Sequence, residues 1–177
     1  MATVATRYDW DTEVLHGVMA SFHHRTNGLS NFPPGATPRP TIFPNGIGLA
    51  ATFDTALVEL VGGVIGSEAR ALNNAVVNAP SGTAWKAAGV ESGEYQGING
   101  YAPNCNLYRD PRWGRAQETY GESPLHNGQT CAAFIRGLQG SNKSSEFLQL
   151  AATVKHYAFY SGPECDHGCA GAANLFS

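Results

Sequence analysis

The sequence has few charged residues and no long apolar run, and each shortage excludes a class of protein. Lys, Arg, Asp and Glu make up 14% of its 177 residues, against roughly a quarter in soluble globular domains. The net charge of −3, with no basic run, gives no electrostatic reason to expect a nucleic-acid partner. No stretch reaches the ~18 unbroken apolar residues of a membrane span, so we expect no membrane partner. An apolar content of 42% excludes a wholly disordered chain.

Cysteine is also scarce. The four cysteines are too few and too scattered to predict a disulfide framework: Cys105, Cys131, Cys165 and Cys169. The segment CDHGC at residues 165–169 superficially suggests a metal site, but it lacks the second ligand pair of a four-coordinate zinc site. We therefore expect no metal.

The first ten residues lack the charged start and apolar core of a secretory signal, which leaves localisation open on these grounds.

Glycine and proline are abundant, at 21 and 10 residues, and they divide the chain into loops and elements. Residues 26–48 are rich in both and predict a long irregular loop. Apolar residues at three- and four-residue steps predict a helix from Phe53 to Leu72, with Asp54 as its N-cap. A second helix is predicted from about Asn127, with Gly140 as its end. Helices alternating with short buried strands, such as the run at 150–154, indicate an α/β protein.

Two groups of polar residues could carry chemistry. Residues 106–118 hold three arginines, an Asp, a Glu and a Trp; guanidinium groups suit sugar hydroxyls, and an indole face suits a pyranose ring. The alternative is a solvated turn in which the arginines pair with Asp110, Glu118 and Glu122. Lys155 and His156 follow the buried run at 150–154, where polar residues in α/β enzymes often meet the ligand. The alternative for this pair is a surface lysine next to a histidine whose hydrogen bonds are made within the protein.

Three separated segments are the most distinctive part of the sequence: YDWDTEVLHGV, NLYRDPRWGRAQETYGESP and VKHYAFYS. Together they resemble glycoside hydrolase family 3, and within it the β-xylosidase-like branch. IGLAATFD, SEARALNN and IRGLQG support the resemblance, and several motifs in one order are more specific than one short pattern. The resemblance predicts a partial barrel domain at residues 1–164 and an unmatched tail at 165–177. One departure is Glu122-Ser123-Pro124, where the family has Glu-Asp-Pro, and it is expected to loosen that turn.

The resemblance implies part of a (β/α)8 TIM-type barrel, here incomplete, with its sugar pocket at the C-terminal ends of the strands. By position, Arg115 would contact the substrate, and Lys155 and His156 would bind sugar hydroxyls in the non-reducing-end subsite. Glu13 falls where xylosidase members carry Glu and glucosidase members carry Asp. The longer carboxylate would crowd a hydroxymethyl group and so favour a pentose. Glu118 would brace the loop, as would Gln117, Arg109 and Arg112.

The implied activity is hydrolysis of O-glycosyl bonds by a retaining β-xylosidase or arabinofuranosidase acting in xylan breakdown, with no cofactor. The implied partners are xylo- or arabino-oligosaccharides. Such enzymes need a nucleophile and an acid/base about 5–5.5 Å apart, and the family places both beyond the Lys-His pair. We find neither in these residues, so we predict no catalytic residue here and an inactive isolated chain. The alternatives are a non-catalytic sugar-binding remnant and a non-functional truncated product. The family implies an extracellular or vacuolar location, and oligomeric state is left open.

Overall fold

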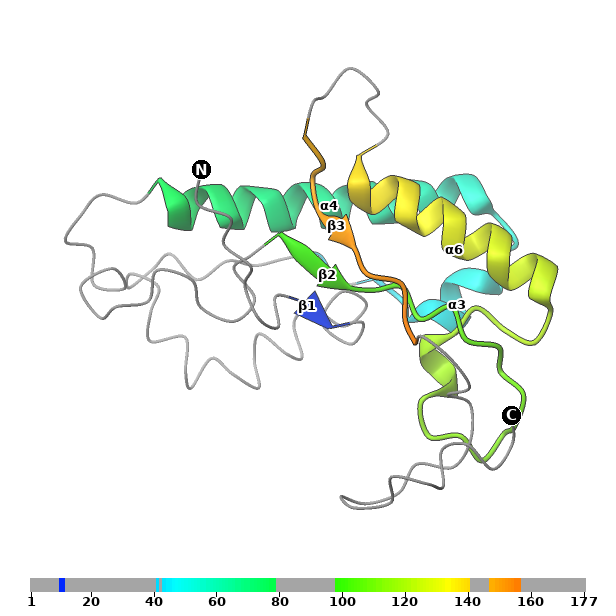
Figure 1. The fold of residues 1–177 in the computed structure, drawn as a ribbon. Helices are drawn as coiled ribbons and strands as arrows, with labels where there is room; N and C mark the ends of the chain where they lie inside the picture. The colour runs from blue at the N-terminus through cyan, green and yellow to red at the C-terminus, as the bar shows by residue number, and fades with distance from the viewer. Residues whose placement is uncertain (1–9, 12–40, 42, 79–97, 141–146, 157–177) are drawn as a thin grey trace, which may run out of the picture.

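The computed structural model describes residues 10–11, 41, 43–78, 98–140 and 147–156 (Figure 1). Glu13, the tail at 165–177 and most of the predicted loop at 26–48 lie outside the described residues. The expectations made for them therefore stay predictions. No helix in the described part of the chain is both long and apolar enough to cross a bilayer.

The described strands form one parallel sheet in the order β1-β2-β3. They are β1 (Trp10–Asp11), β2 (Asn99–Tyr101) and β3 (Ala151–Ala152). Trp10 pairs with Gly100, and Asn99 pairs with Ala151. Parallel neighbours require a crossover connection, and helix α6 (Pro124–Gln139) lies in the connection between β2 and β3. The described residues thus form an α/β arrangement, as predicted, with three strands and no closed barrel among them.

Both predicted helices are present, with different bounds. Helix α4 (Thr55–Val77) begins after Asp54, whose Oδ1 accepts from the Leu57 N–H at 3.0 Å, as predicted. Helix α6 begins three residues before the predicted Asn127 and ends before Gly140, which has a φ of 93°. It begins early because Ser123 caps it, with Oγ accepting from the His126 N–H at 3.4 Å, and because Pro124 suits the first turn.

The short helix α3 (Gly46–Ala50) corrects the prediction that residues 26–48 are irregular to their end. Its N-cap is Asn45, whose side chain accepts from the Gly48 N–H at 3.3 Å. The cap and the buried Leu49 outweigh the helix-weakening glycines at 46 and 48. A 3-10 turn, η1 (Ala116–Glu118), lies between β2 and α6.

Helices α4 and α6 pack side by side and carry much of the core (Figure 1). Val58 and Ile65 of α4 meet the same buried cluster as Phe134 and Leu138 of α6, and each of these side chains is at most 3% exposed. The helices approach closely at Gly137, where an added Cβ would lie 2.1 Å from the backbone oxygen of Glu59. Helix α6 also contacts β3, which places it against the sheet and beside the segment that follows β2.

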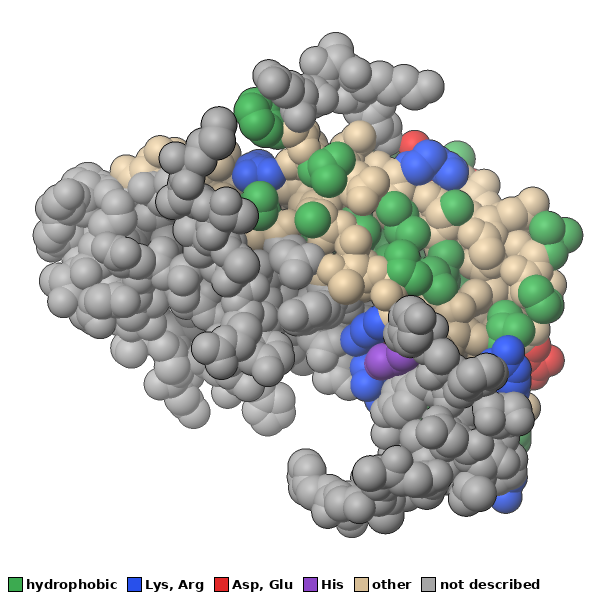
Figure 2. Space-filling model, viewed as in Figure 1, with side chains coloured by type: hydrophobic (Ala, Val, Ile, Leu, Met, Phe, Trp, Pro, Cys, Tyr) green, Lys and Arg blue, Asp and Glu red, His purple; other side chains and the backbone are tan. Residues whose placement is uncertain are grey.

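Large hydrophobic side chains also reach the surface of the described part. Figure 2 shows hydrophobic side chains at several points of the face in view. The most exposed are Phe53, Phe147, Leu125 and Leu60, at 78%, 74%, 71% and 65%. Contiguous apolar groups of this size mark contact surfaces, whereas scattered ones are normal on a protein surface.

Candidate functional site

The candidate site lies where the chain leaves β2 and β3. Beyond the strands the two segments stay parallel, with Asn104 bridged to Lys155. Lys155 N–H donates to the Pro103 carbonyl at 3.1 Å, and Cys105 N–H donates to the Lys155 carbonyl at 2.8 Å. The peptide bond between Lys155 and His156 is cis. These contacts bring Lys155 and His156 beside residues 104–106, at the C-terminal ends of the strands as predicted.

Glu118 joins the polar groups of the site through a buried carboxylate that is 4% exposed. Arg115 makes a two-pronged contact, donating from Nε to Oε1 at 2.7 Å and from Nη2 to Oε2 at 2.8 Å. Asn104 Nδ2 donates to Oε2 at 3.3 Å, and Lys155 Nζ lies 3.9 Å from the same oxygen. Glu118 thus braces the segment, as predicted. Its carboxylate brings Arg115 and Lys155, two of the predicted sugar-binding residues, to one point.

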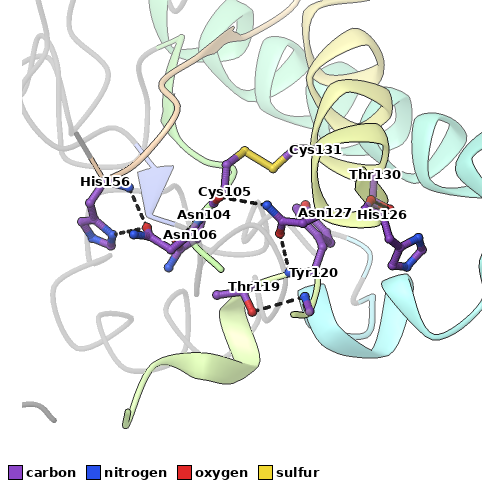
Figure 3. The surroundings of a disulfide bond; sticks show 11 residues. Asn104, Cys105, Asn106, Thr119, Tyr120, His126, Asn127, Thr130, Cys131 and His156 are labelled. Carbon is purple, nitrogen blue, oxygen red and sulfur yellow. Dashed lines mark hydrogen bonds between the residues drawn. A yellow bond between two sulfur atoms is a disulfide. The ribbon is translucent and has the colours of Figure 1, made fainter. Parts of the chain in front are cut away.

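His156 is held by Asn106. The backbone N–H of His156 donates to Asn106 Oδ1 at 2.8 Å, and ring Nδ1 lies 3.0 Å from the same oxygen (Figure 3). Asn106 N–H donates to Asn104 Oδ1 at 3.2 Å. Asn104 therefore contacts both Glu118 and Asn106. The Arg115, Lys155 and His156 positions are connected through these two asparagines and one glutamate.

A disulfide between Cys105 and Cys131 ties this segment to α6, across 26 residues and with Cα atoms 6.1 Å apart (Figure 3). Beside it, Asn127 Nδ2 donates to the Cys105 carbonyl at 2.9 Å, and Asn127 Oδ1 accepts from the Tyr120 N–H at 3.3 Å. One disulfide thus forms among the four cysteines, which the sequence had shown as too few and too scattered to predict a disulfide framework. Two of them meet because one follows β2 and the other faces the core from α6.

The contacts of Arg112 match the alternative in which the arginines pair with nearby carboxylates, but the turn is not solvated as that alternative had it, because Asp110 and Glu118 are buried. Asp110 accepts from Arg112 at its backbone N–H, Nε and Nη2, at 2.8, 3.0 and 2.6 Å. The Arg112 side-chain hydrogen bonds, followed by its backbone hydrogen bond, lower the pKa of Asp110 to about 2. Trp113 is 2% exposed, so its indole is part of the interior and offers no face to a pyranose ring. The suggestion of a stacking platform was therefore wrong.

Asn104 and Asn106 are the structural residues that sequence reasoning missed. Their signal was an Asn-x-Asn pattern after a strand. The strand itself is only three residues long and includes Gly100, so nothing in its periodicity marked residue 104 as a strand exit.

The side chains at this point suit a ligand rich in hydroxyl groups. Arg115 and Lys155 can only donate hydrogen bonds, whereas the histidine and asparagine side chains can donate and accept. Arg115 and Lys155 are both cations, and the buried Glu118 carboxylate offsets part of their positive charge. The site is therefore polar without a large excess of charge. The site is half-buried at Arg115, Lys155 and His156.

Comparison with known proteins identifies the family. Residues 89–173 match the family model described as the glycosyl hydrolase family 3 N-terminal domain. The chain is 38% identical over 160 residues to β-xylosidase/α-L-arabinofuranosidase 1 of Medicago sativa subsp. varia, covering 87% of this chain and 17% of that protein. The chain belongs to glycoside hydrolase family 3.

Other relatives and solved structures are also similar to this chain. Exo-1,4-β-xylosidase bxlB of Emericella nidulans is 37% identical over 153 residues, with 86% of this chain and 17% of that protein covered. Among solved structures, a family 3 exo-β-xylosidase bound to a xylobiose aziridine probe has a TM-score of 0.53 at 31% identity, covering 74% of this chain and 15% of that one. A β-glucosidase of Listeria innocua has a TM-score of 0.51 at 30% identity, covering 70% and 14%. The chain thus spans about a sixth of the length of these relatives. The family match extends past residue 164, where the domain boundary stays a prediction.

Proposed function

We propose that this family 3 chain belongs to a retaining, exo-acting β-xylosidase or arabinofuranosidase, and that it supplies sugar-binding residues of the active site. One observation carries the proposal: Arg115, Lys155 and His156 come together at the C-terminal ends of parallel strands, through Glu118 and Asn106. This is the end of the sheet at which (β/α)8 barrels bind their substrates. The three described strands would then form part of such a barrel.

Each residue has a proposed role that its chemistry allows. Arg115 and Lys155 donate hydrogen bonds to hydroxyl groups of the terminal sugar, and Glu118 holds both cations in place. His156 binds another hydroxyl. Glu13, outside the described residues, narrows the pocket against the hydroxymethyl group of a hexose, so that a pentose such as xylose or arabinose is preferred.

Catalysis in this proposal depends on carboxylates that this chain does not supply. A retaining glycosidase uses a nucleophile and an acid/base, through a covalent glycosyl-enzyme. The family nucleophile lies in a Ser-Asp motif, and the 177 residues contain no Ser-Asp dipeptide. The chain alone is therefore expected to bind sugar without hydrolysing it.

Sugar binding is tested by titrating the purified chain with xylose and following its amide resonances by NMR. We expect saturable shifts, about tenfold weaker binding for Lys155→Ala, and no change for Arg136→Ala. Arg136 is a matched control because it is also a cation paired with a glutamate, Glu59, but on the surface between α4 and α6. A chain that melts cooperatively and shows no saturable shift would contradict the proposal. A chain without a cooperative melt would support the alternative of a non-functional product.

Turnover is tested with an aryl β-xyloside that releases a chromophore. We expect no steady release by the isolated chain. Release that persists through purification and is abolished by Glu13→Ala would overturn the assignment of catalysis to residues outside this chain. Pentose preference is tested by Glu13→Asp, which should narrow the difference in binding between xylose and glucose.

A further inference from the structure

The contact between Asn106 and His156 determines which ring nitrogen of His156 carries a proton. A single oxygen, Asn106 Oδ1, faces both the backbone N–H of His156 at 2.8 Å and ring Nδ1 at 3.0 Å. A backbone N–H can only donate. The asparagine atom facing it must therefore be the amide oxygen, because the amide NH2 group would meet it donor to donor.

The same reasoning extends to the imidazole. An amide oxygen only accepts, so ring Nδ1 must bear the hydrogen that completes the 3.0 Å contact. In a neutral imidazole one nitrogen donates and the other accepts. With Nδ1 protonated, the lone pair is on Nε2. We propose that Asn106 is a positioning residue that fixes His156 in the Nδ1–H tautomer and so makes Nε2 a hydrogen-bond acceptor.

A second pair of contacts fixes Asn106 itself. Its backbone N–H donates to Asn104 Oδ1 at 3.2 Å, while Asn104 Nδ2 donates to the Glu118 carboxylate at 3.3 Å. A carboxylate only accepts, so the orientation of the Asn104 amide is also determined. The preceding residue, Cys105, is tied to α6 by the disulfide and by Asn127. Asn106 is thus held on a segment that cannot easily turn away from His156.

The consequence for the ligand is a division of roles, and this step rests on the proposed function. Arg115 and Lys155 only donate, so they bind oxygen lone pairs of the sugar. His156 Nε2 accepts, so it binds a hydroxyl through its hydrogen. The site would then require a true hydroxyl at the position facing His156, and would reject a methyl ether there, since an ether oxygen has no hydrogen to donate.

The tautomer is tested by long-range ¹H–¹⁵N NMR on the chain labelled with ¹⁵N-histidine, at a pH where the ring is neutral. His156 is identified by the loss of its signals in His156→Gln. We expect a protonated, pyrrole-like Nδ1 and an unprotonated, pyridine-like Nε2, without any sugar present. An unprotonated Nδ1 with a protonated Nε2 in the wild-type chain would overturn the inference.

Variants separate positioning from simple structural support. Asn106→Leu removes the acceptor and is expected to shift signal intensity to the Nε2–H tautomer. Asn106→Asp keeps an acceptor oxygen and is expected to keep Nδ1 protonated, whereas Asn74→Leu on the exposed face of α4 should change nothing. If Asn106→Leu does not fold, the wild-type spectrum and Asn106→Asp still decide. Loss of the Nδ1–H signal in Asn106→Asp, or its retention in a folded Asn106→Leu, would contradict the role.

Xylose titration of the same variants distinguishes this inference from the proposed function. We expect about tenfold weaker xylose binding in Asn106→Leu and a smaller loss in Asn106→Asp. A wild-type chain with Nδ1 protonated but no xylose binding would support the tautomer and contradict the proposed function. Unchanged affinity in an Asn106→Leu chain whose tautomer has switched would overturn the acceptor role of Nε2.

Discussion

Glu118 is the residue on which the cations of the site depend. Its carboxylate is buried and contacts Arg115, Lys155 and Asn104. Removing one member of a buried ion pair leaves the other charge uncompensated, and this costs more than the pair contributes when intact. The carboxylate therefore sets both the stability of this segment and the spacing of two proposed sugar ligands.

Glu118→Gln is expected to lower the free energy of unfolding by about 3 kcal/mol, because Arg115 and Lys155 lose their shared counter-charge. Urea denaturation measures the change. Glu122→Gln is the control, since it makes the same substitution four residues away at an exposed position and should cost less than about 0.5 kcal/mol. Equal losses of unfolding free energy in the two variants would show that the contacts of Glu118 contribute no more to stability than an exposed glutamate does.

The contact between Asp110 and Arg112 predicts how the stability of the fold changes at acidic pH. Arg112 lowers the pKa of Asp110 to about 2, so the folded state binds this proton less readily than the unfolded state, where Asp titrates near 4. The contribution to stability is present above about pH 4 and is lost as the pH falls toward 2. Arg112→Ala should therefore flatten the dependence of urea midpoint on pH between about 4 and 2. An unchanged slope would contradict the assigned contact.

The sequence predicted contacts between neighbouring residues better than contacts between segments. Glu118 lies three residues after Arg115, and their pairing could be inferred from that spacing alone. The approach of Lys155 to Asn104 depends on the register of two strands that are only two and three residues long. Short strands carry too few residues for an alternating pattern, so the sequence could not show that residues 104–106 face the Lys-His pair.

At the scale of elements, the two long helices were predictable because their apolar residues repeat at helical spacing over several turns. Helix α3 was not, since its five residues complete barely more than one turn and two are glycine. The pairing of Cys105 with Cys131 was not predictable either, because it requires the docking of α6 on the segment after β2. Spacing along the chain carries no information about that docking.

The contact between α4 and α6 predicts opposite effects for two glycines of one helix. Gly137→Ala would place a Cβ 2.1 Å from the Glu59 carbonyl oxygen and should destabilise the chain by about 2 kcal/mol. Gly128→Ala on the same helix meets nothing within 4 Å and should stabilise it by about 0.5–1 kcal/mol, because alanine favours helix. Thermal unfolding of both variants checks this, and a destabilising Gly128→Ala would contradict it.

The disulfide is expected to contribute about 3 kcal/mol, mainly by restricting the unfolded chain across 26 residues. Wild-type chain should melt at lower temperature in reducing buffer than in oxidising buffer. The double variant Cys105→Ser/Cys131→Ser should melt at the same temperature in both. If the double variant still melts at different temperatures in the two buffers, the redox effect comes from other cysteines.

At the scale of the whole molecule, the described sheet has β1 and β3 at its edges and large apolar side chains at its surface. Open edges and exposed apolar groups favour association. The isolated 177-residue chain should therefore self-associate as its concentration rises, which sedimentation velocity measures. Leu125→Gln and Phe147→Gln, at two of the most exposed positions, should reduce it. A concentration-independent monomer would contradict this reading of the surface.

The disulfide also makes a covalent ring of the segment that runs from Cys105 to Cys131. The exposed arginines at 109 and 112 lie inside that ring and are natural points of tryptic cleavage. A cut at either would open the backbone without separating the two pieces, which would stay joined through sulfur. The strand exits that carry Lys155 and Asn104 would thus stay covalently connected after such a cut. Separating the pieces would require unfolding as well as reduction, because α4 of one piece also packs against α6 of the other.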